Sequence, residues 1–128
     1  MKKNKITIEI NKPVEEVFLF TTNPKNTSFW IDSVEVEKSN EWPPKLGTIY
    51  RNRGTENIWN KYRVVNIKEN EVFELFSSDG NYHARYTYKD LGGKAELEYF
   101  EWVDSGDIED PFTQSVLGKL KTIMESEG

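Results

Sequence analysis

Carboxylates and phenols are the side chains of this sequence that could do acid–base chemistry. The chain has 128 residues, with 22 acidic residues, six tyrosines, one histidine and no cysteine. The histidine, His83, lies two residues before Arg85 in a predicted strand, so both side chains point to the same charged face. We expect His83 to be an ordinary surface residue. The lack of cysteine excludes thiol catalysis, and a single histidine gives no support for a zinc site. We therefore expect neither a metal nor a cofactor.

The acidic stretch ELEYFEWVDSGDIED, residues 96–110, could supply paired carboxylates or a metal site. Alternation along a strand turns Glu96 and Glu98 toward solvent, and the end of the stretch is typical of a loop and a helix cap. Glu101 differs, because it continues the inward series that begins at Ala95. We expect Glu101 at the mouth of a cavity, where it could contact a ligand or, with a raised pKa, act as a general base.

Several other classes of function have no sequence support. The chain contains no Ser-His-Asp, phosphate-loop or dinucleotide motif. Its net charge of −5 gives no overall attraction to nucleic acid. No run approaches the ~20 apolar residues that span a bilayer, and the basic start MKKNK is followed by the alternating ITIEI instead of the apolar block of a signal peptide. We expect a cytoplasmic protein that binds no nucleic acid and has no membrane span.

The elements that position these side chains are predicted to form one domain, residues 1–128. An alternating strand over residues 5–10 is followed by a helix that begins at Pro13. Asn23 as a cap and Pro24 at the first helical position predict a second, very short helix that ends near Trp30. A second strand follows around residues 34–37, and WPPKLG is predicted to be a loop.

The rest of the chain is predicted to be a meander closed by a helix. Short breaks at RGTEN, KENE, SDGN and DLGG have the composition of hairpin turns and separate five antiparallel strands. Asp110 as a cap and Pro111 at the first position then begin an amphipathic helix of about four turns. Gly118 in its middle costs about 1 kcal/mol relative to alanine.

Side-chain alternation divides the predicted strands into two faces of different character. One, which we call the tyrosine face, is predicted to be the inner face, covered by the C-terminal helix. It holds all six tyrosines of the chain: Tyr50, Tyr62, Tyr82, Tyr86, Tyr88 and Tyr99. The other, the outer face, is charged, and on it acidic and basic strands alternate. It holds Glu35, Glu37, Arg51, Arg53, Lys61, Arg63, Glu74, His83, Arg85, Glu96 and Glu98.

Each face admits two interpretations. The outer face can be a solvated surface stabilised by cross-strand ion pairs of roughly 0.2–1 kcal/mol each, or a basic docking patch for an acidic partner. That patch would consist of Arg51, Arg53, Lys61 and Arg63. On the tyrosine face, buried hydroxyl groups need hydrogen-bond partners. The tyrosines either fill the sheet and satisfy their hydroxyls at its rim, or leave them to water or a ligand.

The sequence also resembles a known superfamily over nearly its whole length. ITIEINKPVEEVFLFTTNPKNTSFW, with its Pro13, Val17-Phe18 pair, Asn23-Pro24 and Trp30, resembles the opening of the START-like superfamily. This superfamily, also called SRPBCC, includes the birch pollen allergen, polyketide cyclase-like and lipid-transfer proteins. LGTIYR, YRVVNI and LGGKAELEYFEW resemble later landmarks. The resemblance implies an α+β helix-grip fold, in which a curved seven-stranded antiparallel sheet (β-α-α-β6-α) wraps around the C-terminal helix with a hydrophobic cavity between them.

This resemblance leads to one expected function and two alternatives. We expect a small apolar or aromatic ligand in the cavity between sheet and C-terminal helix. One alternative is a cyclase- or dehydratase-type enzyme that uses a tyrosine or Glu101 as acid or base in the same cavity. The other is a protein-interaction module, like the superfamily's chaperone activators, that uses the basic patch. The residues expected to bind the ligand are Trp30, Tyr50, Asn60, Tyr62, Phe73, Tyr86, Tyr99, Phe112, Val116 and Leu120.

Overall fold

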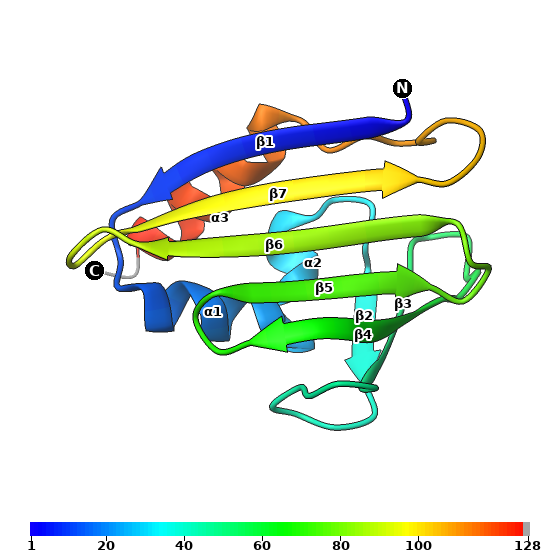
Figure 1. The fold of residues 1–128 in the computed structure, drawn as a ribbon, viewed down its shortest axis with the longest axis horizontal. Coiled ribbons are helices and arrows are strands. Elements are labelled where there is room, and N and C mark those ends of the chain that lie inside the picture. Colours follow the sequence, from blue (N-terminus) through cyan, green and yellow to red (C-terminus); the bar gives the residue numbers. More distant parts are fainter. Residues whose placement is uncertain (127–128) are drawn as a thin grey trace.

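A computed structural model describes residues 1–126 of the chain and shows an α+β fold. Seven strands and four helical segments follow one another as the ribbon in Figure 1 shows. In chain order they are β1 (Lys3–Ile10), α1 (Val14–Thr22), the 3-10 helix η1 (Pro24–Asn26), α2 (Thr27–Trp30), β2 (Val36–Ser39), β3 (Ile49–Arg53), β4 (Asn60–Lys68), β5 (Val72–Ser77), β6 (Tyr82–Asp90), β7 (Ala95–Val103) and α3 (Gln114–Ser126).

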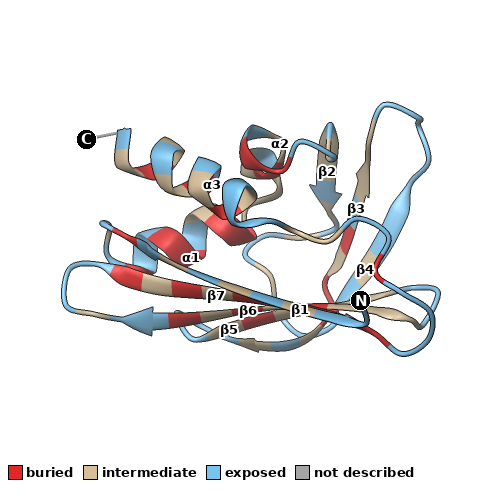
Figure 2. Ribbon diagram, turned by 90° about the horizontal axis from the view of Figure 1, so that it is seen from above, coloured by how far each residue is buried: buried red, intermediate tan, exposed pale blue. Residues whose placement is uncertain are grey.

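All seven strands form one antiparallel sheet. Its strand order is β1-β7-β6-β5-β4-β3-β2, so β2 to β7 form a meander and β1 closes the far edge against β7. Figure 2 shows every helix on one face of this sheet and the β3–β4 end curving up toward the helices. The curved seven-stranded sheet and the β-α-α-β6-α order predicted from the sequence are confirmed.

Local signals placed most element boundaries correctly. The turn between β4 and β5 falls in KENE, where Asn70 has φ 63°, and the turn between β6 and β7 falls in DLGG, where Gly92 has φ 79°. This left-handed backbone suits glycine and asparagine. The side chain of Asn23 accepts a hydrogen bond from the backbone N–H of Lys25, as predicted for a cap.

The C-terminal helix begins three residues later than predicted. α3 starts at Gln114, whereas Asp110 and Pro111 belong to the loop before it. Two contacts hold this loop in an extended course: the backbone N–H of Phe112 donates to Glu101 at 2.8 Å, and the Phe112 ring stacks on Tyr99 with 4.1 Å between centroids. The expected cap at Asp110 is therefore wrong, because tertiary contacts override the local signal.

The two faces of the sheet have the predicted character over β3 to β7. Tyr50, Tyr86, Tyr88 and Tyr99 are all buried on the helix side. On the outer face, Glu74 and Arg85 are directly opposite in β5 and β6, with 3.7 Å between their charged atoms. Ion pairs that cross neighbouring strands in this way stabilise a solvated face.

The outer face also carries an aromatic cluster around the single histidine. The His83 ring lies between Phe76 and Trp102, with 4.5 Å between centroids on each side. Its Nε2 is 3.0 Å from a carboxylate oxygen of Asp104. His83 is on the outer face as predicted, but it packs between two rings instead of standing free.

Strand β2 breaks the predicted alternation. Glu37 was expected on the outer face, yet it lies directly opposite Asn52 of β3 and both side chains face the helices. The cause is a bend at Glu35, just before the strand begins at Val36. Because of this bend, Val34 and Glu37 turn to the same side although they are three positions apart, which in a regular strand would put them on opposite faces. The placement of Glu37 on the outer face is therefore wrong.

Candidate functional site

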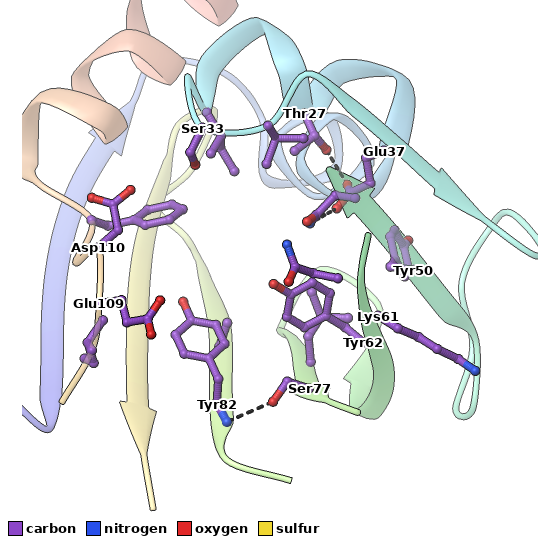
Figure 3. A pocket seen from close by; sticks show the side chains of 18 of the residues that line it. Thr27, Ser33, Glu37, Tyr50, Lys61, Tyr62, Ser77, Tyr82, Glu109 and Asp110 are labelled. Atoms are coloured by element: carbon purple, nitrogen blue, oxygen red, sulfur yellow. Dashed lines mark hydrogen bonds between the residues drawn. The ribbon is translucent and has the colours of Figure 1, made fainter. Parts of the chain in front are cut away.

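The tyrosine face bounds a cavity of about 520 Å³ under the curved end of the sheet. Its floor comes from β3 to β7, and its sides come from α2 with the segment that follows it and from the loop of residues 107–112 (Figure 3). The cavity therefore lies beside α3, not beneath it. The lining residues used below are Thr27, Ser33, Glu37, Tyr50, Asn52, Asn60, Lys61, Tyr62, Phe73, Asp79, Tyr82, Tyr86, Tyr99, Asp107, Glu109, Asp110 and Phe112.

Most tyrosine hydroxyls on this face are held by the protein framework. Tyr50 donates to the backbone carbonyl of Thr22 at 2.7 Å, and the Tyr88 hydroxyl is 2.7 Å from that of Thr21. These two contacts tie the sheet to α1, since both threonines lie in that helix. The interpretation that tyrosines fill the sheet and bond to its surroundings thus holds for part of the set.

Tyr62 and Tyr86 differ from the other four tyrosines. Within residues 1–126 neither hydroxyl makes a well-formed hydrogen bond, although that of Tyr62 lies near the Asn52 side chain. Tyr86 is only 6% exposed and lines the cavity. Burial and the charge of Glu37 raise the pKa of Tyr62 to about 12, and burial raises that of Tyr86 well above 10. Both phenols are therefore neutral hydrogen-bond donors that face the cavity.

Glu37 brings a carboxylate to the inner side of the sheet. One of its oxygens accepts from the Thr27 hydroxyl at 2.5 Å, and the other accepts from the Asn52 amide at 3.1 Å. Burial raises the pKa of Glu37, and these two hydrogen bonds partly oppose the rise. Figure 3 shows Glu37 and Thr27 on one side of the cavity and Glu109 on the other, with Tyr62 and Tyr82 between them.

Seven of the ten residues expected to bind a ligand line this cavity. They are Tyr50, Asn60, Tyr62, Phe73, Tyr86, Tyr99 and Phe112. Asn60 is exposed at the mouth, whereas Tyr50, Phe73 and Tyr99 are almost completely buried. Their role in ligand binding stays a prediction.

Trp30, Val116 and Leu120 are not brought to the cavity. α3 packs over β1 and against α2, so Val116 and Leu120 belong to the core at that end of the sheet. Trp30 was expected near the entrance but is 1% exposed, with its ring edge against Tyr86 and Phe112. Its indole N–H has no partner among the described residues. The short α3 does not reach the curved half of the sheet, which explains why its residues leave the cavity wall to the loop of residues 107–112.

Glu101 lies within the fold and not at the cavity mouth. It is completely buried, and its carboxylate accepts hydrogen bonds from the hydroxyl of Tyr82 at 2.6 Å, the amide of Asn4 at 2.8 Å and the backbone N–H of Phe112. Tyr82 uses its only proton on Glu101, so the 2.8 Å contact with Tyr99 is donated by Tyr99. The expected position at the mouth is therefore wrong, and the geometry makes Glu101 an anchor for the loop before α3.

Sequence reasoning missed several residues of the cavity. The segment after α2 and the loop before α3 contribute Ser33, Glu109 and Asp110, and Glu37 was assigned to the wrong face. The amides of Asn52 and Asn60 on an otherwise apolar face were a usable signal, because polar groups there call for a polar neighbour. The loop residues carry no local signal of their own.

The four residues of the predicted basic patch share the outer face of two strands. Arg51 lies directly opposite Lys61, and the alternation along β3 and β4 brings Arg53 and Arg63 to the same side. Arg53 is already paired with Glu35 at 3.4 Å and packs on the ring of Trp59. An acidic protein partner for this patch stays a prediction.

Comparison with known proteins identifies the fold of this chain but not its activity. No family model matches the chain, and no curated protein matches it. A START superfamily protein from Mycobacterium smegmatis superposes with a TM-score of 0.75 at 12% identity, and each chain is covered completely. The di-domain ARO/CYC BexL from the BE-7585A biosynthetic pathway superposes with a TM-score of 0.74 at 13% identity, covering 98% of this chain and 47% of BexL. A Polyketide_cyc-like protein from Corynebacterium glutamicum superposes with a TM-score of 0.58 at 20% identity, covering 79% of this chain and 64% of that protein.

These likenesses establish that the chain has the START-like (SRPBCC) helix-grip fold. The chain spans about half the length of BexL. Within residues 1–126, no helix is long and apolar enough to cross a membrane. The same residues contain no group of three or more histidine, cysteine, aspartate or glutamate side chains that could hold a metal ion.

Proposed function

We propose that this protein binds a small, mainly apolar or aromatic molecule in the cavity of the tyrosine face. The observation that carries the proposal is the Tyr86 hydroxyl: the residue is 6% exposed and lines a space of about 520 Å³, and its hydroxyl makes no hydrogen bond within residues 1–126. Among the described residues Trp30 Nε1 is the only completely buried side-chain polar atom without a partner, so the Tyr86 hydroxyl is open to the cavity, where an acceptor group of a ligand can bond to it.

The dimensions and the lining of the cavity support the same proposal. Small-molecule pockets usually measure about 300–1,000 Å³ and combine apolar walls with a few polar groups. Here the partly exposed rings of Tyr62, Tyr82 and Phe112 supply apolar surface, while the hydroxyls of Tyr62 and Tyr86 supply donors. The names of two structural neighbours, a START superfamily protein and a Polyketide_cyc-like protein, agree with such a role.

Native mass spectrometry against a library of lipids and aromatic compounds tests the proposal. Any bound species should be lost in Ser33→Trp, because Ser33 is an exposed residue of the cavity wall and an indole there fills the opening. Thr55→Trp is the matched control, since Thr55 is exposed and does not line the cavity. Binding that survives Ser33→Trp, or the absence of any ligand together with side chains that fill the cavity in a crystal structure, would refute the proposal.

A cyclase-type enzyme is the second candidate function, and one chain of hydrogen bonds favours it. The hydroxyls of Tyr99 and Tyr82 and the carboxylate of Glu101 form a continuous hydrogen-bonded chain that reaches the cavity wall. Such a chain could move a proton to or from a reacting group. Tyr82→Phe should then abolish turnover while leaving ligand affinity nearly unchanged; equal loss of both would leave binding as the only function.

A further inference from the structure

The walls of the cavity carry an excess of negative charge. Among residues 1–126, its carboxylates are those of Glu37, Asp79, Asp107, Glu109 and Asp110, and Lys61 is the only basic residue that lines it. Lys61 is exposed, and Figure 3 shows its ammonium group directed away from the space between Glu37 and Tyr82. Asp107 is paired with the amino group of Met1 at 3.1 Å, which still leaves four carboxylates without a cation inside the cavity.

Glu37 is the carboxylate best placed to meet a ligand. Its two hydrogen-bond donors, Thr27 and Asn52, are both neutral, and no cation pairs with it among residues 1–126. Each carboxylate oxygen can accept a second donor, so Glu37 has unused capacity. A partly buried carboxylate without a counter-ion is unfavourable, and burial accordingly raises the pKa of Glu37. A cation in the cavity would supply the missing counter-ion.

The aromatic walls favour the same kind of ligand. The rings of Tyr62, Tyr82 and Phe112 line the cavity and keep part of their surface exposed to it, with the nearly buried ring of Tyr86 behind them. The face of an aromatic ring carries negative charge density and attracts a cation, most strongly where water is excluded. The Tyr86 hydroxyl, which has no partner within the described residues and is not completely buried, adds a hydrogen-bond donor at the wall of the same space.

We propose that the ligand of this cavity carries a positively charged nitrogen, as an ammonium or quaternary ammonium group, which the Glu37 carboxylate and the surrounding tyrosine rings hold. The inference rests on the proposed function and narrows its ligand class. It also disfavours anionic ligands such as fatty acids, because the four carboxylates without a cation repel them.

Three probes of nearly equal shape and different charge test this inference. Phenyltrimethylammonium is a permanent cation, tert-butylbenzene is its neutral isostere, and benzenesulfonate is an anion of similar size. We would measure their dissociation constants by NMR titration at low ionic strength. The cation should bind at least about tenfold tighter than tert-butylbenzene, the effect of one charge-assisted contact, and benzenesulfonate should bind most weakly.

The decisive variant is Glu37→Gln, which keeps an oxygen for Thr27 and removes the charge. This variant should raise the dissociation constant of phenyltrimethylammonium about tenfold and leave that of tert-butylbenzene unchanged. Glu35→Gln is the matched control, because Glu35 lies two residues away, is exposed and does not line the cavity. If Glu37→Gln fails to fold, the double variant Glu109→Gln with Asp110→Asn removes two charges from the exposed rim of the cavity. It should raise the dissociation constant of phenyltrimethylammonium roughly twofold to fivefold.

The outcomes separate the two proposals. If tert-butylbenzene binds as tightly as the cation, or if the Glu37 and rim variants bind the cation normally, this inference is wrong and the proposed cavity function stands. If none of the three probes binds the wild-type protein, this inference is wrong, and the library screen with Ser33→Trp decides the proposed function.

Discussion

Replacement of Glu101 by methionine tests the buried hydrogen-bond network that positions the cavity wall. Glu101 accepts from Tyr82, Asn4 and the backbone of Phe112, and it has no exposed surface. Methionine has a similar shape and accepts hydrogen bonds only weakly. In Glu101→Met, Tyr82 can turn its proton elsewhere, but two nitrogen donors lose their acceptor. At roughly 1–3 kcal/mol for each orphaned donor, the free energy of unfolding should fall by about 2–6 kcal/mol.

Urea unfolding followed by tryptophan fluorescence measures this loss. Glu98→Met is the matched control, because Glu98 lies three residues earlier in β7 and faces the outer side. Its effect should stay within about 0.5 kcal/mol, as for most surface substitutions. Glu101→Gln keeps one acceptor oxygen and should cost less than methionine. The amide of Phe112 should also exchange its hydrogen faster in Glu101→Met. A Glu101→Met protein as stable as Glu98→Met would refute the anchoring role.

Two further predictions concern other parts of the fold. Burial raises the pKa of Glu37, so folding favours its protonated form. The free energy of unfolding of the wild type should therefore rise relative to that of Glu37→Gln as the pH falls from neutral toward 4.5. The nearby Tyr50, Tyr62 and Tyr86 stay neutral over this range, because their pKa values are raised. Urea titrations at several pH values measure the difference, and a pH-independent one would contradict it. In α3, an added Cβ at Gly118 would meet no atom within 4 Å, so Gly118→Ala should stabilise by about 0.5–1 kcal/mol. Calorimetry should show that the melting temperature of Gly118→Ala rises by about 2–5 °C. The melting temperature of Gly92→Ala should fall, because Gly92 has φ 79°, which alanine adopts only with strain.

The sheet could be predicted from the sequence because its signals are local. The glycine and asparagine turns fix where each hairpin reverses, and strict alternation then sends Tyr62, Tyr86 and Tyr99 to one face. The same alternation put Arg51 and Lys61 on the other face, where they lie directly opposite each other. Six cavity residues were found in this way without any knowledge of tertiary contacts, and Phe112 was expected from the side of the C-terminal helix.

The errors fall where structure depends on contacts distant in the sequence. The alternation of Val34 and Val36 gives no hint of the bend at Glu35, and that bend brings Glu37 inward. Similarly, Asp110 and Pro111 form a good helix start by local chemistry, but the bond from Phe112 to Glu101 and the ring stack on Tyr99 delay the helix. Which half of the sheet α3 covers is also a tertiary property, and it removed Val116 and Leu120 from the cavity.

Two carboxylates face inward from this sheet, and their hydrogen bonds assign them different roles. Glu101 accepts from three donors, one of which is a backbone N–H, so its oxygens are used by the fold and it holds the loop before α3 in place. Glu37 accepts from only two neutral side chains and borders an open cavity whose other charged lining residues are acidic, except for the exposed Lys61. A group satisfied by its own fold contributes little to recognition, whereas one with spare acceptor capacity gains most from a ligand. The residue that the sequence singled out, Glu101, is therefore the structural member of the pair, and Glu37 is the member to which we assign the proposed recognition of a cationic ligand.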